Sequence, residues 1–146
     1  MIGEDPEKCP FCNIEERKNE IIYRGESVSA ILPDEQVRRV HVLIIPNEHV
    51  RKLVELDDET SLEMFHLLSR VVNILEEKFD IDGYNVAINQ GKFAGQKVRH
   101  LHIHIIARIE GDLEDPEKWL NPEIVRSNGS ENFDVEKLMD GLQDEL

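Results

Sequence analysis

The chain has 146 residues, 40% of them hydrophobic and 33% charged, which fits one domain with enough length for a hydrophobic core. No apolar run approaches the length of a membrane span, so the composition argues against a membrane protein. The formal net charge of −14 argues against a long nucleic acid as the main partner, because proteins hold nucleic acids chiefly through Lys and Arg on phosphates.

The N-terminal segment MIGEDPEKCPFC is acidic and lacks the apolar stretch of a signal peptide, which predicts a cytoplasmic protein. It carries both cysteines of the chain, Cys9 and Cys12. In a reducing compartment such a C-x-x-C pair is redox-active, half of a metal site, or idle.

The chain then alternates short apolar segments with turn residues. A hairpin is expected because two strand-like segments flank Gly25. Pro46 ends the next strand, since proline cannot donate to a sheet ladder. The expected elements are, in order, a short helical turn over 10–18, strands over 21–25, 27–32 and 40–46, and a polar turn over 33–39.

The longest predicted helix is DDETSLEMFHLLSRVVNILEEKF, residues 57–79. Asp57 suits the N-terminal cap. Thr60 and Glu63 match a capping box, and Gly83 lies where a C-cap glycine is expected. Apolar residues recur at spacings of three and four, which predicts one buried helix face made of Leu62, Phe65, Leu68, Val72, Leu75 and Phe79.

Residues 84–89 are expected to form a strand, residues 90–97 a glycine-bearing loop, and residues 98–108 another strand. Residues 132–143 have the pattern of a final helix, within a C-terminal stretch, 111–146, whose many acidic side chains predict a solvated region. One long helix among five strands, several joined by short turns, predicts an α+β domain with an antiparallel sheet.

Three of the six histidines occupy alternate positions in the strand RHLHIHIIAR. Side chains alternate across a strand, so His100, His102 and His104 share one face, with neighbouring imidazoles roughly 7 Å apart at Cβ. The opposite face is aliphatic and is expected to pack into the core. Such a face suits two chemistries: imidazole ligands for zinc, or a neutral imidazole that attacks phosphorus while its neighbours donate hydrogen bonds to phosphate oxygens.

The loop QGKFAGQK before this strand favours phosphate. Gly91 and Gly95 allow a ligand to approach the backbone closely. Lys92, Lys97 and Arg99 bring positive charge to one place in an otherwise acidic chain, and a local basic pocket can override the global sign. Nucleophilic attack on phosphate is therefore the favoured chemistry, and zinc held by the three strand histidines is the alternative.

The segment GQKVRHLHIHIIAR resembles the signature of the histidine triad (HIT) family of nucleotide hydrolases and transferases, in which histidines alternate with apolar residues. HVLIIPNEHV resembles the upstream strand of that family, and CPFCNI resembles the N-terminal segment of its Hint-like members. The resemblance extends from about Cys9 to Arg108. It implies a single HIT-like domain over residues 1–146, with a core at about 9–110, a five-stranded antiparallel sheet, one long helix, a short N-terminal helix and a C-terminal helical tail.

The resemblance also implies roles for individual residues. His102 would be the catalytic nucleophile that accepts a nucleoside monophosphate group, with its Nδ1–H fixed by a backbone carbonyl and its Nε2 free to attack. His104 would donate to a non-bridging phosphate oxygen, and His100 would be the third catalytic histidine. The other nucleotide-binding residues would be His41, which completes the pocket, Asn89, Gly95 and Gln96 near the phosphates, and Phe11, Ile14 and Ile22 around the base, where core packing is the alternative.

Two positions depart from the family pattern. Lys97 stands where related enzymes have Ser or Thr near the leaving group, and a nucleotide-binding lysine there suits a more anionic leaving group such as a pyrophosphate chain. The aspartate that holds the ribose hydroxyls in the family maps onto Pro33. The neighbouring Asp34 is expected to substitute for it.

Some HIT proteins bind a structural zinc ion through a C-x-x-C pair, a histidine after the upstream strand, and the first triad histidine. The matching residues here are Cys9, Cys12, His49 and His100. If the two histidine-bearing strands are antiparallel neighbours, the end of the first lies beside the start of the second, which brings His49 close to His100. Two thiolates and two imidazoles form a common tetrahedral zinc set, and His100 would then be structural. The alternative is an idle, reduced cysteine pair.

The resemblance thus predicts a cytoplasmic enzyme that cleaves a nucleotide conjugate at its α-phosphate through a covalent nucleotidyl-His102. The conjugate would be a dinucleoside polyphosphate or a nucleoside phosphoramidate containing AMP or GMP. No nucleic acid or membrane is involved, and the enzyme would be a homodimer. The alternative is a nucleotide-binding regulatory protein with little catalysis.

Overall fold

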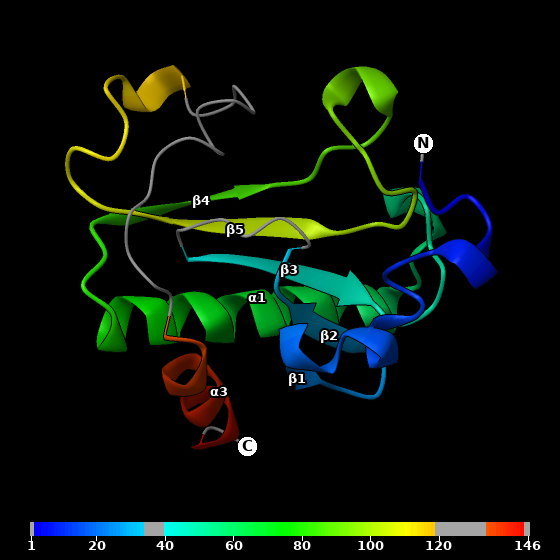
Figure 1. Cartoon of the computed structure of the whole chain (residues 1–146), viewed down its shortest axis with the longest axis horizontal. Coiled ribbons are helices and arrows are strands. Elements are labelled where there is room, and N and C mark those ends of the chain that lie inside the picture. Colours follow the sequence, from blue (N-terminus) through cyan, green and yellow to red (C-terminus); the bar gives the residue numbers. More distant parts are fainter. Residues whose placement is uncertain (1, 34–39, 119–133, 145–146) are drawn as a thin grey trace.

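The computed structural model describes residues 2–33, 40–118 and 134–144. These residues form one antiparallel sheet with a long helix along one face, as Figure 1 shows. The predicted polar turn at 33–39 lies almost wholly outside the described residues, and so does the predicted ribose ligand Asp34. Within the described ranges, no helix is long and apolar enough to cross a membrane.

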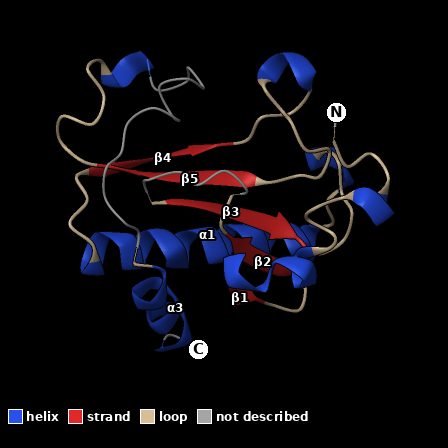
Figure 2. Cartoon of the chain, viewed as in Figure 1, coloured by secondary structure: helices blue, strands red, loops and turns tan. Residues whose placement is uncertain are grey.

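The sheet has five strands in the order β1-β2-β3-β5-β4, and every neighbouring pair is antiparallel (Figure 2). This confirms the predicted α+β class, the number of strands and the neighbourhood of the two histidine-bearing strands. The strands are β1 (Ile21–Arg24), β2 (Val28–Ile31), β3 (His41–Pro46), β4 (Gly83–Ala87) and β5 (Ile103–Arg108).

The long helix α1 (Asp58–Lys78) begins at the predicted cap. The carboxylate of Asp57 accepts a hydrogen bond from the backbone N–H of Thr60 at 2.7 Å. The predicted Thr60–Glu63 capping box is therefore wrong, because Asp57 already occupies the cap position and Thr60 lies inside the first turn. The C-cap glycine is also wrong: the helix ends at Phe79 in an extended conformation, and Gly83 begins β4.

The buried face of α1 is only partly the predicted one. Leu62 and Phe65 are 72% and 69% exposed, which contradicts the prediction, although Leu68, Val72 and Leu75 are buried as expected. The helix carries two overlapping apolar stripes, and the buried one is the stripe that faces the sheet and α3. The buried side chains are Met64, Leu67, Leu68, Val71, Val72, Ile74 and Leu75.

The sheet separates two hydrophobic clusters. The larger one lies between the sheet and α1, and it includes Leu101, Ile103 and Ile105 from the predicted aliphatic face. The smaller one lies against the N-terminal segment, which contains two 3₁₀ helices, η1 (Pro6–Lys8) and η2 (Ile14–Glu20), in place of the expected helical turn. Its buried members are Cys9, Phe11, Ile14, Ile31, Leu43 and Ile45.

The C-terminal helix α3 (Val135–Asp144) corrects the expectation of a solvated acidic tail. It packs on α1 and β1, and its Leu138 and Leu142 are fully buried in the larger cluster. Arg70 of α1 donates a hydrogen bond to the Leu142 carbonyl at 2.6 Å. The side chains of Glu136 and Asp140 are exposed on the other side of α3, so this part of the C-terminal region belongs to the folded core.

Candidate active site

The predicted strand over 98–108 is shorter in the structure. β5 begins at Ile103, so His100 and His102 precede it, and only His104 lies within the ladder, opposite Leu43 of β3 and Ala87 of β4. The alternation still holds, because Leu101, Ile103 and Ile105 pack into the core while His104 lies on the other face. The β3–β5–β4 centre of the sheet therefore supports the histidines.

His102 is held by the backbone that precedes it. Its Nδ1 lies 2.7 Å from the carbonyl oxygen of His100, which can only accept, so Nδ1 carries the proton and Nε2 carries the lone pair. The residue is 6% exposed, and within the described ranges its Nε2 makes no hydrogen bond. Burial lowers the pKa of His102 below 6.5, against the opposing effect of this hydrogen bond. The ring is therefore neutral at pH 7, with Nε2 available as a nucleophile.

His41 and His104 form a pair beside His102. The His41 Nε2 lies 3.0 Å from the His104 Nδ1, and the His102 and His104 rings meet edge-on with centroids 4.8 Å apart. Burial, and then the charges of His102 and Arg108, lower the pKa of His41 to about 4. Burial, His102 and His41 lower the pKa of His104 to about 3. Both rings are thus neutral at pH 7 and act as oriented hydrogen-bonding groups.

The glycine loop is shaped by its own residues. Gly91 and Gly95 have φ values of 96° and 90°, a region that favours glycine. The side chain of Gln96 is 6% exposed and closes the loop from inside: its carbonyl accepts from the Gly91 N–H at 2.8 Å, and its amide donates to the Val98 carbonyl at 3.0 Å. Asn89 lies against this loop, since a Cβ on Gly95 would sit 3.7 Å from its Nδ2. Lys97 is exposed.

The apolar residues assigned to the base are buried. Phe11, Ile14 and Ile22 are 4%, 1% and 4% exposed, and all three belong to the hydrophobic clusters. Their burial supports the alternative of core packing, although base contact is untested. Phe11 has a further contact that the sequence did not predict: its ring meets the ring of His102 edge-on, with centroids 5.1 Å apart.

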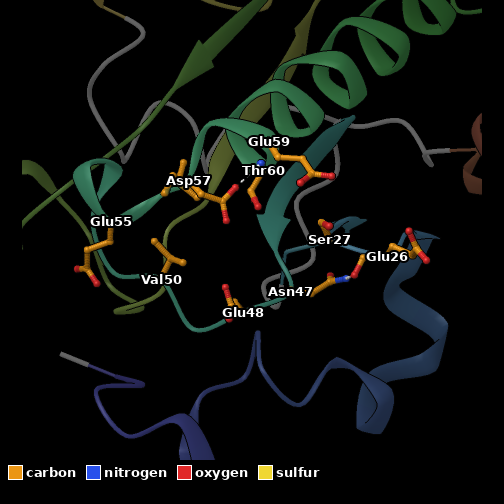
Figure 3. A pocket seen from close by; sticks show the side chains of 10 residues that line it. Glu26, Ser27, Asn47, Glu48, Val50, Glu55, Asp57, Glu59 and Thr60 are labelled. Atoms are coloured by element: carbon orange, nitrogen blue, oxygen red, sulfur yellow. Dashed lines mark hydrogen bonds between the residues drawn. The ribbon is translucent and has the colours of Figure 1, made fainter.

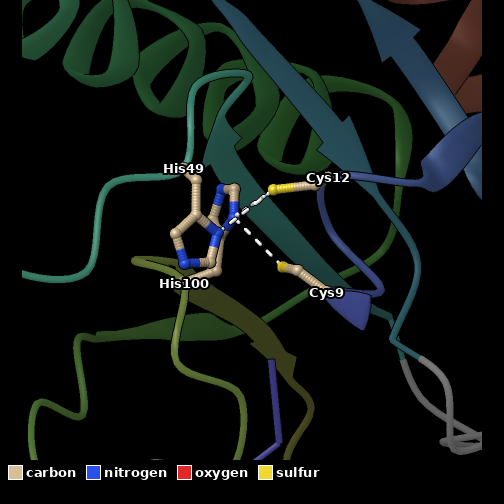
Figure 4. A group of neighbouring side chains, drawn as sticks. All are labelled: Cys9, Cys12, His49 and His100. Atoms are coloured by element: carbon tan, nitrogen blue, oxygen red, sulfur yellow. Dashed lines mark hydrogen bonds between the residues drawn. The ribbon is translucent and has the colours of Figure 1, made fainter. Parts of the chain in front are cut away.

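A second cluster joins both cysteines to two histidines, as Figure 4 shows. The ligand atoms of Cys9, Cys12, His49 and His100 all lie within 4.8 Å of one another. The His100 Nδ1 is 3.4 Å from the Cys9 Sγ and 3.5 Å from the Cys12 Sγ, and the His49 Nδ1 is 3.1 Å from the Cys12 Sγ. The four predicted zinc ligands are therefore brought together, and they could hold a metal ion.

The donor set fits zinc. Tetrahedral bonds of about 2.0–2.3 Å separate neighbouring ligand atoms by about 3.3–3.8 Å, close to the three separations found. The His100 Nε2 lies 2.8 Å from the Pro46 carbonyl, so this nitrogen carries the proton and the Nδ1 lone pair faces the thiols. Burial lowers the pKa of His100 to about 4, which keeps the ring neutral at pH 7.

The three strand histidines do not share one pocket. His100 is fully buried with its ring toward the cysteines, and Phe11 contacts both the His100 and the His102 rings. Of the three imidazoles expected around one ligand, only those of His102 and His104 lie side by side, and His100 is turned to the cysteines. Zinc held by all three is also unsupported, because the metal-capable cluster within the described ranges contains His100 without the other two.

Two features of the site were missed from the sequence. The Pro46 carbonyl orients His100, and backbone acceptors leave no sequence signal. Arg108, at the end of β5, donates from Nε to the Asn85 side chain at 2.9 Å and lies 3.5 Å from Asp112. The signal for this second feature was an arginine two positions after Ile106, the ladder partner of His41, which places it on the same strand face and near His41.

A cavity of about 270 Å³ lies elsewhere, between the β1–β2 turn, the end of β3 and the start of α1 (Figure 3). Five acidic side chains line it, and none of the histidines does. Carboxylates repel phosphate, so this cavity does not suit a nucleotide. Its acidic lining residues are Glu26, Glu48, Glu55, Asp57 and Glu59.

The comparisons with known proteins agree with the geometry. The model of the HIT domain matches residues 15–111. The chain is 35% identical over 105 residues to the bis(5'-adenosyl)-triphosphatase of Dictyostelium discoideum, covering 72% of this chain and 70% of that protein. It is 30% identical over 129 residues to an adenosine 5'-monophosphoramidase of Schizosaccharomyces pombe, covering 84% and 94%.

Among solved structures, a zinc-bound histidine triad family protein from Mycobacterium smegmatis superposes with a TM-score of 0.69. The two sequences are 29% identical, and the superposition covers 97% of this chain and all of that one. The paired strands that carry His41 and His104, the backbone that holds His102, and the match over most of the chain lead to one assignment. This protein is a member of the HIT domain family.

Proposed function

We propose that this protein cleaves a nucleotide conjugate at its α-phosphate and forms a covalent nucleotidyl intermediate on His102. The observation that carries the proposal is the 2.7 Å contact between the His102 Nδ1 and the His100 carbonyl, which leaves the lone pair on Nε2. An imidazole in this state attacks phosphorus, and the phospho-imidazole is itself a good leaving group. The likeness to a bis(5'-adenosyl)-triphosphatase and to an adenosine 5'-monophosphoramidase supports cleavage at the phosphate of a nucleotide.

The proposed reaction uses His102 as the nucleophile and the neighbouring His41–His104 pair as the hydrogen-bonding group. The His102 Nε2 attacks the α-phosphorus, and the bond from phosphorus to the leaving group breaks with its electron pair on the leaving group. A His104 that accepts from His41 at Nδ1 carries its own proton at Nε2, where it donates to a non-bridging oxygen as charge builds. Water or another acceptor then attacks phosphorus, and the P–N bond breaks to regenerate neutral His102. His100 holds the nucleophile and takes no proton.

The leaving group is set by the loop. Lys97 is exposed next to Gln96 and brings positive charge where related enzymes have a hydroxyl. An ammonium group stabilises a departing polyphosphate more than a departing amine, because the polyphosphate carries more negative charge. The proposed substrate class is therefore a dinucleoside polyphosphate, ahead of a nucleoside phosphoramidate.

A substrate panel tests both statements. We expect dinucleoside polyphosphates to be cleaved with a higher kcat/KM than phosphoramidates, and mass spectrometry of quenched reactions to find one nucleoside monophosphate group on the protein. Lys97→Thr should reduce the ratio of the two kcat/KM values by about tenfold, since one charged contact of about 1.4 kcal/mol is lost. AMP binding without turnover of any substrate would contradict the enzyme and favour the nucleotide-binding regulatory protein.

The Cys9–Cys12–His49–His100 cluster is proposed to hold a structural zinc ion. Its support is the donor set, the separations of the ligand atoms, and the zinc-bound relative of the same fold. When bound, the metal would lock the N-terminal segment to the start of the histidine segment. It would take no part in the reaction at phosphorus.

A homodimer is also proposed, through α1 and β4. β4 is an edge strand, and its Tyr84 and Val86 are exposed on the side of the sheet that α1 covers, since they pair with Ala107 and Ile105. Within the described residues α1 packs mainly on β2, β3 and β5, and Tyr84 and Val86 on this edge remain 42% and 38% exposed. Phe65 adds to it from the flank of α1 opposite the one that contacts α3. Apolar surface of this kind on an edge strand favours a second copy as its cover.

Light scattering on a sizing column tests the dimer. Wild-type protein should elute at twice the chain mass, and Phe65→Glu should shift it to the monomer mass, because the substitution places a charge in an apolar interface. Lys78→Glu adds negative charge at the other end of the same helix and should leave the dimer intact. A monomeric wild-type protein at micromolar concentration, or a dimer unaffected by Phe65→Glu, would contradict the proposal.

A further inference from the structure

Phe11 links the cysteine cluster to the nucleophile. It lies between Cys9 and Cys12 in the CPFC segment, and its ring is 4% exposed. The edge contact to His102 has centroids 5.1 Å apart at an interplanar angle of 73°, and the contact to His100 has centroids 5.7 Å apart at 84°. One buried ring therefore braces both histidines that set the position of the attacking atom.

The His102 ring has two restraints on the side of the cysteine turn, a hydrogen bond to the His100 carbonyl and the contact with Phe11, and they restrain different motions. The hydrogen bond from Nδ1 to the His100 carbonyl fixes which nitrogen carries the proton, but it allows the imidazole to rock about the bond. The Phe11 ring lies edge-on to the imidazole and blocks that rocking. The opposite side of the His102 ring faces His104, with the two ring centroids 4.8 Å apart. The direction of Nε2 therefore depends on the ring of Phe11 as well as on the hydrogen bond.

The place of Phe11 is in turn fixed by its neighbours in sequence. The thiols of Cys9 and Cys12 both point at the His100 Nδ1, at 3.4 and 3.5 Å. The Asn13 side chain donates to the Cys9 carbonyl at 2.8 Å, which closes the turn that carries Phe11. Because contacts fix the backbone on both sides of Phe11, its ring is a rigid support.

We propose that Phe11 is a positioning residue for His102: its ring aims the nucleophile, and it does so from the cysteine turn. The inference rests on the proposed function, because it assigns a residue that acts through the proposed nucleophile. It differs from the role implied by family resemblance, in which Phe11 contacts the base. A base contact would mainly affect binding of the nucleotide, whereas aim affects the rate of the covalent step.

The test compares Phe11→Leu with substitutions at Ile31, which lies in the same hydrophobic cluster and pairs with Leu43 in the sheet. Ile31→Val and Ile31→Ala bracket the stability loss of Phe11→Leu. Zinc-saturated proteins are mixed with excess nucleotide conjugate, and the rate of nucleotidyl-His102 formation is followed by rapid quench and mass spectrometry. Nitrogen-15 spectra of the imidazoles report the proton position and the line width of His102.

We expect Phe11→Leu to slow formation of the intermediate by roughly three- to tenfold, with an unchanged KM and broadened His102 signals. Neither Ile31 variant should change the rate, whatever its melting temperature. A raised KM with an unchanged rate would overturn the proposal in favour of base contact, and so would a rate that simply follows melting temperature across all three variants. If wild-type protein forms no intermediate, the proposed function fails; if it does and Phe11→Leu matches it, only this inference fails.

Discussion

Replacing His102 with alanine is expected to lower turnover of every active substrate by about four orders of magnitude or more and to abolish the covalent intermediate. The proposed nucleophile is this imidazole, whose Nδ1 is held by the His100 carbonyl so that Nε2 carries the lone pair. Steady-state rates on the best dinucleoside polyphosphate and mass spectrometry of quenched protein measure the two effects. Calorimetric titration with AMP should still detect binding, because His41, His104 and the glycine loop remain.

The matched control is His66→Ala, which removes an exposed histidine from α1, away from the site. It should leave both turnover and the intermediate at wild-type levels. Normal activity of His102→Ala, or an intermediate that persists on another residue, would remove the nucleophile assignment. The circular dichroism spectrum is recorded on every variant, because its loss in His102→Ala would mean that the variant does not fold. His102→Asn provides a second replacement that keeps a polar side chain.

Removing the metal is expected to lower the free energy of unfolding by about 4 kcal/mol, the value for zinc at 1,000 times its dissociation constant. The ion would join Cys9 and Cys12 to His49 and His100, segments that lie far apart in the chain. Burial, and then the neighbouring Cys9, raise the pKa of the Cys12 thiol to about 12. Metal binding must therefore displace a proton from this thiol, and the zinc-dependent stability should increase as pH rises from 6 to 8.

Urea denaturation with and without a chelator measures the loss, and elemental analysis gives the zinc content. In Cys12→Ser the chelator should have no effect on the unfolding midpoint, while in His66→Ala its effect should equal that in wild-type protein. A wild-type protein that is purified without zinc, takes up none, and unfolds at the same urea concentration in both conditions would favour the idle cysteine pair.

The sheet could be predicted from the sequence because its signals are local. Alternation around Leu101, Ile103 and Ile105 placed one face in the core, and Pro46 marked the end of a strand. The rotation of α1 could not be predicted, because Leu62 and Phe65 continue the same period as the residues that are buried. A free edge of the sheet and the position of α3 decide which stripe is covered, and neither is a property of the helix sequence.

The C-terminal helix α3 is the opposite case, in which residues of a region expected to be solvated are buried. Leu138 and Leu142 have the spacing of one helix turn, but the acidic residues around them favoured solvent in a reading based on charge. Their burial depends on a surface provided by α1 and β1. At Gly141 the α3 backbone comes so close to α1 that an added Cβ would lie 3.0 Å from the Ile74 side chain. Long-range surfaces of this kind are not encoded next to the residues that use them.

In the candidate site, side-chain identity was predictable and orientation was not. The four metal-capable residues were found from the family resemblance, although Cys9 and His100 are 91 positions apart. The turn of the His100 ring away from His102 could not be found in this way, because both choices satisfy the strand alternation. It is decided by the Pro46 carbonyl and by the thiols, which take the two nitrogens of that ring.

Gln96 has a consequence for how a nucleotide would be received. Its amide spans the glycine loop through Gly91 and Val98, so the curve of the backbone is completed during folding. A loop of free glycines would lose its conformational freedom only when a ligand arrived, and affinity would fall accordingly. Here the two hydrogen bonds of Gln96 restrict that freedom as the protein folds. A phosphate group would therefore bind to a loop that is already ordered. Its association rate would depend on diffusion and charge, because no rearrangement of the loop would have to come first.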